Sequence, residues 1–448
     1  MNYKTIIIAN IAEAFEDALM RVKSQKERTK KVQIEHNLCD RTLLWEGDNK
    51  IVITPFAISP LLFGHNIKAL GFKNCLNLFP KDVNINLSNA IIKDKALMKK
   101  LMGVIKENPG IRISPYAVTQ SFIDLTEIFK KENLDFIVGE RPYKNSDWTV
   151  QFLDSKIGSR VEIDKIKDND INTPKSVICR NKKEAIEVAE WFYKNNVSFV
   201  VKANFGEGGW GTLIIKKDDR KSWEEVSLKI KGEFSNDSIW DDGLIIVEEY
   251  ITAERGISSG CPSSELFLSE KGPQITYLCD QVVTEAGNFL GVALGKNALD
   301  EKVKDKINKA SIIVGKRFWE LGYRGFFDID FVLSKDNGTP YIIETNMRRT
   351  GGTHIFDVAR LIFGDKWEEK TFVLSQDSFS YGEKLLSEKV ILEKMKDILF
   401  PINNEKRGLI ISIINKWKSA FGFIIVEESS DKALKIYSEM KNLFNIKN

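Results

Sequence analysis

The stretch that decides the fold is Arg324–His354, which reads RGFFDIDFVLSKDNGTPYIIETNMRRTGGTH. It contains two runs rich in β-branched and aromatic residues, separated by the turn sequence KDNGT. An Asn-Gly turn between two such runs is typical of a β-hairpin. The sequence therefore predicts two antiparallel strands at this point.

Acidic and amide side chains stand near the ends of both predicted strands. Asp330 precedes the turn, while Glu344 and Asn346 follow it and lie two residues apart, on the same face of their strand. Hard oxygen ligands gathered in this way are typical of Mg²⁺ sites that nucleotide phosphates complete. An ordinary solvated hairpin is the alternative, but the ending Glu-x-Asn-x-Arg followed by Thr-Gly-Gly-Thr-His argues against it.

This hairpin resembles the metal-binding core of the ATP-grasp superfamily. The resemblance implies that ATP and two Mg²⁺ ions bind here, with Mn²⁺ able to substitute, and that the metal ligands are Asp330, Glu344 and Asn346. It also implies a catalytic Arg348 that stabilises the transferred phosphoryl group. Some members carry an arginine two residues before the first metal acid, where this chain has Asp328. Arg348 takes over that task, or Asp328 adds a polar contact; pairing of Arg348 with Asp328 or Asp330 is the structural alternative.

Composition limits the class of protein. The chain has 448 residues, of which 43% are hydrophobic and 29% charged, so we expect a soluble protein of two to four domains. A net charge of +3 offers no argument for nucleic acid binding. The five cysteines form no C-x-x-C pair, which argues against a disulfide framework or a zinc site.

Targeting to a membrane is not expected either. The chain has no apolar run of about 18 residues. The early run TIIIANIA is followed at once by Glu13, Glu16 and Asp17, so we interpret it as a first strand and not as a signal peptide. We therefore expect a cytoplasmic protein.

Strands and helices alternate from Thr5 to about Arg141, which predicts a largely parallel sheet. We expect strands at 5–10, 41–47, 50–56 and 134–140, and helices at 11–25, capped by Asn10, and 114–133, with Ser114 as N-cap and Pro115 first. No glycine-rich loop follows the first strand, so no dinucleotide site is assigned. This region resembles the pre-ATP-grasp domain, and the stretch from Ser114 to Lys156 resembles the peptide ligases related to the pheganomycin ligase.

A glycine-rich loop lies between two predicted strands. Its residues are Gly206, Glu207, Gly208, Gly209, Trp210 and Gly211. A Rossmann loop requires a helix directly afterwards, and a strand follows here. A protein kinase would also carry HRD and DFG sequences, which are missing. We expect the loop amides to close over the triphosphate, and Lys202, just before the loop, to bind phosphate and assist catalysis. A flexible glycine hairpin is the alternative.

The family order implies further ATP-binding residues. In ATP-grasp enzymes a lysine before a short linker reaches the α-phosphate, which points to Lys156. The buried strand that ends near residue 250 matches the hinge between the lobes, where adenine and ribose bind. The implied residues there are Glu248, Glu249, Tyr250, Ile251 and, for the ribose, Glu254. Each of these groups taken alone is more often a solvated surface feature.

The predicted fold is α/β (α+β), with two ATP-grasp lobes behind a Rossmann-like pre-ATP-grasp domain. We predict that domain at residues 1–150, the first lobe with its lid at 151–250, the second lobe with the metal site at 251–385, and a small α/β appendage at 386–448.

The resemblance implies an ATP-dependent carboxylate–amine ligase that works through an acyl phosphate and releases ADP and phosphate. The expected substrates are small-molecule or peptide carboxylates and amines, without nucleic acid or membrane partners. We leave open a carrier protein as acceptor, a homodimer, and a scaffold that binds ATP without catalysis.

Overall fold

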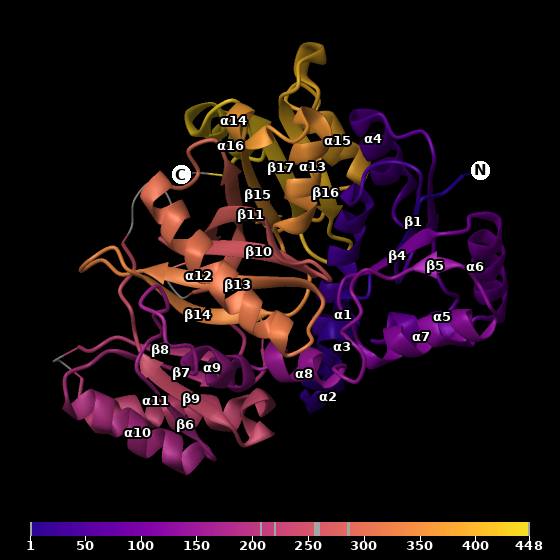
Figure 1. The fold of residues 1–448 in the computed structure, drawn as a ribbon. Helices are drawn as coiled ribbons and strands as arrows, with labels where there is room; N and C mark the ends of the chain where they lie inside the picture. Colours follow the sequence, from indigo (N-terminus) through magenta and orange to yellow (C-terminus); the bar gives the residue numbers. More distant parts are fainter. Residues whose placement is uncertain (1, 207, 219–220, 255–259, 285–286, 447–448) are drawn as a thin grey trace.

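The computed structural model describes residues 2–206, 208–218, 221–254, 260–284 and 287–446. Within these residues the strands form three sheets, one of five, one of eight and one of four strands (Figure 1). Helices accompany each sheet, and the mixed α/β fold predicted from the sequence is confirmed. None of the described helices combines the length and the apolar character that crossing a membrane requires.

The N-terminal sheet is parallel throughout, as the alternating pattern predicted. Its strand order is β3-β2-β1-β4-β5. The strands are β1 (Thr5–Ile8), β2 (Lys50–Ile53), β3 (Cys75–Leu78), β4 (Ile111–Pro115) and β5 (Phe136–Ile137). The helices are α1 (Ile11–Ala14), α2 (Glu16–Arg21), α3 (Gln25–Leu38), α4 (Pro60–Leu70), α5 (Leu87–Lys93), α6 (Lys95–Glu107) and α7 (Gln120–Lys131).

Two predictions about the start of the chain were wrong. The helix expected over 11–25 is interrupted at Phe15, whose backbone leaves helical geometry at φ −111° and ψ 15°. Asn10 does not cap it with its side chain, because that amide bridges to the backbone of Tyr116 and Ala117 instead. A local capping pattern thus gave way to a contact between the first and fourth strands.

Two further predictions in this region were wrong. Residues 41–47 form no strand, because Cys39–Leu44 is a 3₁₀ helix (η1) that is buried on all sides. A short apolar run cannot by itself distinguish these two outcomes. Ser114 and Pro115 end β4, and the following helix begins at Gln120, with the Thr119 hydroxyl accepting the Phe122 N–H at 3.1 Å.

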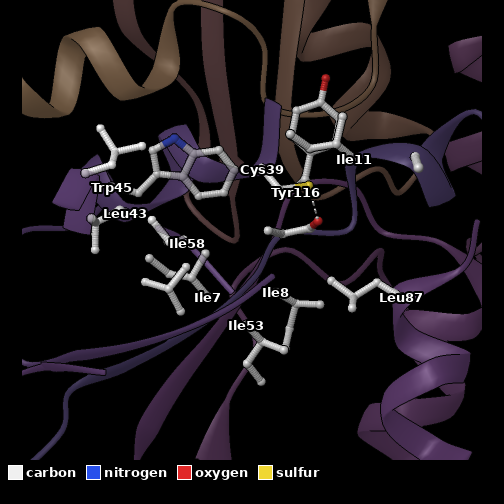
Figure 2. Close-up of a cluster of buried hydrophobic side chains, with 14 of the residues drawn as sticks. Ile7, Ile8, Ile11, Cys39, Leu43, Trp45, Ile53, Ile58, Leu87 and Tyr116 are labelled. Carbon is white, nitrogen blue, oxygen red and sulfur yellow. Dashed lines mark hydrogen bonds between the residues drawn. The ribbon is translucent and has the colours of Figure 1, made fainter. Parts of the chain in front are cut away.

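The core of this region packs against the 3₁₀ helix (Figure 2). Trp45, just after η1, stacks on Tyr116 with an interplanar angle of 11°. Cys39 is fully buried and donates its thiol to the Ala9 carbonyl at 3.0 Å. Burial raises the pKa of this thiol, so Cys39 acts as a small apolar group. These contacts place η1 and Tyr116 at the edge of the cavity described below.

The four-stranded sheet is antiparallel, with the order β6-β9-β7-β8. Its strands are β6 (Ser176–Cys179), β7 (Phe199–Ala203), β8 (Thr212–Ile215) and β9 (Ile245–Glu249). Helices α10 (Lys182–Lys194) and α11 (Trp223–Asn236) lie along it, while α8 (Trp148–Asp154) and α9 (Lys156–Asp164) precede it (Figure 1). A 3₁₀ helix, η2 (Ser238–Asp242), leads into β9.

The eight-stranded sheet has the order β14-β13-β10-β11-β12-β15-β17-β16. The strands are β10 (Pro262–Ser269), β11 (Gly272–Val283), β12 (Phe289–Gly295), β13 (Gly325–Leu333), β14 (Pro340–Asn346), β15 (Phe372–Ser380), β16 (Gly408–Ile414) and β17 (Ala420–Glu427). The helices are α12 (Glu301–Glu320), α13 (Thr353–Phe363), α14 (Trp367–Lys370), α15 (Glu388–Met395), α16 (Ser430–Leu443) and the 3₁₀ turn η3 (Ile402–Asn404). Strands β16 and β17 belong to the same sheet as the β13–β14 hairpin. The domain boundaries stay a prediction.

Candidate active site

The predicted hairpin forms, and its register brings four polar side chains into two facing pairs. Asp328 on β13 lies opposite Asn346 on β14, and Asp330 lies opposite Glu344. A bulge between Asp330 and Phe331 shifts the register, and the pairing resumes with Phe331 opposite Ile342. Side chains that face one another across antiparallel strands are within contact distance. The structure therefore joins the three predicted metal residues, together with Asp328, on one face of the hairpin.

The two aspartates lie in a polar cluster in which Asp328 is buried and Asp330 is half-buried. The Gln281 amide donates to Asp330 at 2.5 Å, the Ser263 hydroxyl donates to Asp328, and Asn346 Nδ2 lies 3.1 Å from Asp330 Oδ2. Burial, followed by the charges of Asp328 and Glu344, holds the pKa of Asp330 well above its usual range. Burial also raises the pKa of Asp328 to about 6. Carboxyl groups whose pKa is raised by burial and by a neighbouring carboxylate are stabilised in their charged form by a cation.

The oxygen atoms of these side chains suit a hard cation, but the amide of Asn346 is turned away from the orientation that coordination requires. No group of three or more His, Cys, Asp or Glu side chains with metal-binding geometry occurs among the described residues, and the predicted set contains an amide. The nitrogen of Asn346 faces the carboxylates, whereas its oxygen accepts from Arg348 at 3.0 Å. A metal ligand must present the oxygen, so coordination requires rotation of this amide.

Two lysines neutralise the acidic side of the site. Lys156 Nζ lies 2.6 Å from Glu344 Oε1 and donates to the Gly206 carbonyl at 3.0 Å. Lys202 Nζ lies 2.5 Å from Glu248 Oε1 and donates to the Ile343 carbonyl at 3.0 Å. Burial opposes the ionisation of Glu344, but the charges of Lys156 and Lys202 outweigh it and lower the pKa of this carboxyl.

The predicted glycine-rich loop is the tip of the β7–β8 hairpin. Four of its glycines have positive φ angles: Gly206 (143°), Gly208 (53°), Gly209 (96°) and Gly211 (76°). Trp210 donates its indole N–H to Asp237 at 2.7 Å, and Lys31 Nζ lies 3.7 Å from the centre of its ring. Gly208, Gly209 and Trp210 line the cavity, whereas Glu207 lies outside the described residues.

The hinge residues are only partly placed as the family pattern implies. Glu248 is 2% exposed and pairs with Arg160 at 2.7 Å as well as with Lys202. Four residues of this segment, Glu248, Glu249, Tyr250 and Ile251, line the cavity, but Glu254 does not, and it is exposed. The ribose assignment of Glu254 therefore has no support from its position.

Arg348 lies beside the metal residues, but its ion-pair partner differs from the expected ones. Its Nη1 is 2.6 Å from Asp154 Oδ1 on α8, and its guanidinium lies 4.7 Å from the centre of the Phe15 ring. The expected structural alternative named Asp328 or Asp330 as partner. Asp154 could not be found from the sequence, because α8 and β14 are distant in the chain and meet only in the fold.

The site opens into one cavity of about 830 Å³. One part of its lining contains predicted ATP-binding and metal residues, among them Lys202, Trp210, Glu248, Ile251, Asp330 and Glu344. The lining continues past Arg348 to residues of α3, η1 and β15 that the sequence analysis did not single out. Gln281, Ser263 and Arg160 were also missed, since none of them belongs to a local motif.

Comparison with known proteins agrees with this arrangement. Residues 159–352 match the family described as the carbamoyl-phosphate synthase L chain, ATP binding domain, a match that spans under half of the chain. No curated protein matches the sequence significantly.

Solved structures that resemble the chain cover nearly its whole length. Biotin carboxylase from Campylobacter jejuni has a TM-score of 0.56 at 14% identity, covering 98% of this chain and 94% of its own. The N5-carboxyaminoimidazole synthase from Aspergillus clavatus has a TM-score of 0.55 at 9% identity, covering 99% of both chains. The N5-carboxyaminoimidazole synthetase from Staphylococcus aureus has a TM-score of 0.52 at 10% identity, covering 98% of both. The chain thus has the ATP-grasp fold, and its residues 159–352 match the model of an ATP-binding domain.

Proposed function

We propose that this protein is an ATP-dependent carboxylate–amine ligase that forms an amide or peptide bond and releases ADP and phosphate. The observation that carries the proposal is the cluster of Asp330, Glu344 and Asn346, which lies with Lys202 and the glycine-rich hairpin in the lining of one cavity, while Lys156 pairs with Glu344. Carboxylates and lysines arranged in this way suit a magnesium–nucleotide complex. The ADP bound in the Staphylococcus aureus and Aspergillus clavatus relatives supports placing ATP here.

The residues divide the work between binding and charge neutralisation. The loop amides around Gly208 and the ammonium group of Lys202 bind the phosphates, and Lys156 leaves Glu344 for the phosphate chain. When bound, Mg²⁺ held by Asp330, Glu344 and Asn346 supplies positive charge against the phosphoryl oxygens. Arg348 presents a planar guanidinium to the carboxylate substrate or the transferred phosphoryl group.

The proposed chemistry has two steps. A carboxylate oxygen of the first substrate attacks the γ-phosphorus of ATP; the bond from phosphorus to ADP breaks and an acyl phosphate forms. A neutral amine then attacks the acyl carbon. The carbon–nitrogen bond forms, the carbon–oxygen bond to phosphate breaks, and the amine nitrogen gives up one proton to solvent. Positioning and electrostatic stabilisation provide most of the catalysis in phosphoryl transfer, so no covalent nucleophile is required.

The proposal is tested by incubating the protein with ATP, Mg²⁺ and mixtures of carboxylic acids and amines. We expect ADP and phosphate to form in proportion to an amide product detected by mass spectrometry. Hydroxylamine in place of the amine should give a hydroxamate, the product expected from a trapped acyl phosphate. ATP binding without ADP formation under all mixtures would favour a scaffold and overturn the proposal.

Several finer expectations belong to the same proposal. The peptide-forming class is supported by the sequence resemblance to the peptide ligases related to the pheganomycin ligase. A cytoplasmic location, a carrier protein as acceptor, homodimeric assembly, two metal ions and replacement of Mg²⁺ by Mn²⁺ stay predictions.

A further inference from the structure

One face of helix α3 lines the part of the cavity that the proposed ATP site leaves over. Lys31, Ile34, Glu35 and Leu38 all contribute to the lining. Their spacing of three, four and seven residues places them along one stripe of the helix. Neither the metal cluster nor the phosphate-binding residues explain why this stripe faces the cavity, so it is a candidate for binding the second substrate.

Arg41 follows this stripe on η1 and is buried beside the cavity. It is 3% exposed, and its Nη1 lies 2.5 Å from Asp377 Oδ2 on β15. Within the described part of the chain, the buried Nε of Arg41 has no hydrogen-bond partner. Arg41 lines the cavity, so its guanidinium can offer charge-assisted hydrogen bonds to a carboxylate bound there.

Asp377 also lines this part of the cavity. Its other oxygen lies 3.9 Å from Nε2 of His354, which is fully buried. Burial, and then the nearby charge of Arg41, hold the pKa of His354 well below its usual range, so this imidazole is neutral and does not offset the aspartate. Burial also raises the pKa of Asp377, although the charge of Arg41 opposes the change.

The glycine pair after the metal strand keeps this end of the cavity open. A Cβ atom on Gly351 would lie 2.8 Å from the ring of Phe289 and 3.3 Å from Asp377 Oδ2. A Cβ atom on Gly352 would lie 2.3 Å from the hydroxyl of Tyr277. Larger residues would push these walls apart, so the Thr-Gly-Gly-Thr-His motif serves the shape of the pocket as well as the end of the strand.

From these contacts we propose that the amine substrate is an α-amino acid with an apolar side chain and a free carboxylate. The guanidinium of Arg41 binds the carboxylate, Asp377 receives the amino group, and the side chain lies against Ile34, Leu38 and Phe289, all of which line the cavity. The two positive and two negative residues of this region, Lys31 and Arg41 against Glu35 and Asp377, match the two opposite charges of such a zwitterion. This inference rests on the proposed ligase function and adds the class of acceptor.

The first test uses the unaltered protein and chemically blocked acceptors. With Mg²⁺-ATP and a carboxylic acid that supports hydroxamate formation, apolar amino acids such as L-leucine are compared with L-leucinamide and with 4-methylpentanoate. We expect L-leucine or another apolar amino acid to give an amide product. L-leucinamide, whose carboxylate is blocked, should give no product or be used at least tenfold less efficiently. Equal use of leucine and leucinamide, or no product with any apolar amino acid, would overturn the inference.

The second test changes the two anchors. Arg41→Lys keeps the charge but loses the planar guanidinium, and Asp377→Asn removes the charge that receives the amine. Each should raise KM for the amino acid about tenfold or more, as expected when a buried polar contact to a substrate is lost. Hydroxamate formation and the KM for ATP are measured beside it, so that a loss confined to the amino acid is distinguished from a loss of the first step. The control is Arg180→Lys, an exposed residue paired with Glu184 on α10.

The outcomes separate this inference from the ligase proposal. Absence of both ADP and hydroxamate with every acid would refute the ligase function itself. Normal hydroxamate formation together with an unchanged amino acid KM in Arg41→Lys would refute only the acceptor assignment. If Arg41→Lys does not fold, the comparison of leucine with leucinamide on the unaltered protein still decides the question.

Discussion

Lys156 and Glu344 form an ion pair that joins the start of α9 to the end of β14, with Nζ 2.6 Å from Oε1. One residue is proposed to bind phosphate and the other to bind metal, so each serves as the counter-charge of the other. Binding of a magnesium–nucleotide complex supplies both groups with new partners of opposite charge. The site can therefore accept a highly charged ligand without leaving either group unpaired.

Glu344→Gln should reduce ADP formation by a factor on the order of 10²–10³, the usual loss when one preorganised charge-stabilising group is removed. The chain should stay folded, because the hairpin register depends on backbone pairing and not on this carboxylate. A coupled ADP assay over a range of Mg²⁺ concentrations measures the effect. Glu439→Gln, at an exposed position on α16, is the control, and turnover close to normal in Glu344→Gln would remove the metal assignment.

Lys202→Ala should weaken ATP binding by about 10- to 100-fold, since charge-assisted hydrogen bonds contribute roughly 1.5–3 kcal/mol. Glu248 keeps Arg160 as a partner at 2.7 Å, so the substitution leaves no unpaired buried carboxylate. Isothermal titration with a non-hydrolysable ATP analogue gives the affinity, and Lys435→Ala on α16 is the exposed control. An unchanged dissociation constant would contradict the role assigned to Lys202.

Binding of nucleotide should change the fluorescence of Trp210, because its ring is in contact with Lys31 and its indole N–H with Asp237. The loop amides gain phosphate partners when ATP is bound, so the loop should also become more resistant to proteases. Both effects should require Mg²⁺-ATP and be weakened in Lys202→Ala. Equal protease cleavage with and without nucleotide would argue against a lid.

Arg348→Lys should keep ATP binding but lose ligation by a factor on the order of 10². The guanidinium contacts Asp154 at 2.6 Å and the Asn346 oxygen at 3.0 Å through different nitrogens, and an ammonium group cannot reproduce this fork. Nucleotide affinity, thermal midpoint and ADP formation are measured together. Arg317→Lys, which alters an ion pair with Glu162, is the control. A lowered midpoint with normal ADP formation would make Arg348 purely structural.

Asp40→Asn should raise the thermal midpoint most at about pH 8, less at about pH 5, and hardly at all below about pH 4. Burial raises the pKa of Asp40 to about 7, so the folded chain favours its protonated form. That stabilisation is complete below the unfolded pKa of about 3.9 and is lost as the pH rises through about 7. Asp431→Asn on α16 is the exposed control, and parallel pH profiles of the midpoint in Asp40→Asn and unaltered protein would refute the assignment.

The sequence alone determined the metal hairpin, the glycine hairpin and the order of the cationic and acidic residues along the chain. These features were predictable because a strand has a side-chain period of two and because Asn-Gly and glycine-rich turns depend on local backbone freedom. Asp330 could thus be placed near Glu344 and Asn346 on one hairpin before the fold was known, whereas the register that sets Asp330 opposite Glu344 comes from the structure. The same local reasoning failed at 41–47, where an apolar run became a buried 3₁₀ helix, and at Ser114, where a capping pattern ended a strand.

Only the tertiary structure decided which distant groups meet. Arg348 pairs with Asp154, Lys202 with Glu248, and Arg41 with Asp377, and each pair joins elements that are far apart in the chain. Such pairings depend on the packing of the three sheets and not on local propensity. The second half of the cavity is lined by residues of α3, η1 and β15 that no sequence motif marks. The proposed class of acceptor rests on this tertiary arrangement.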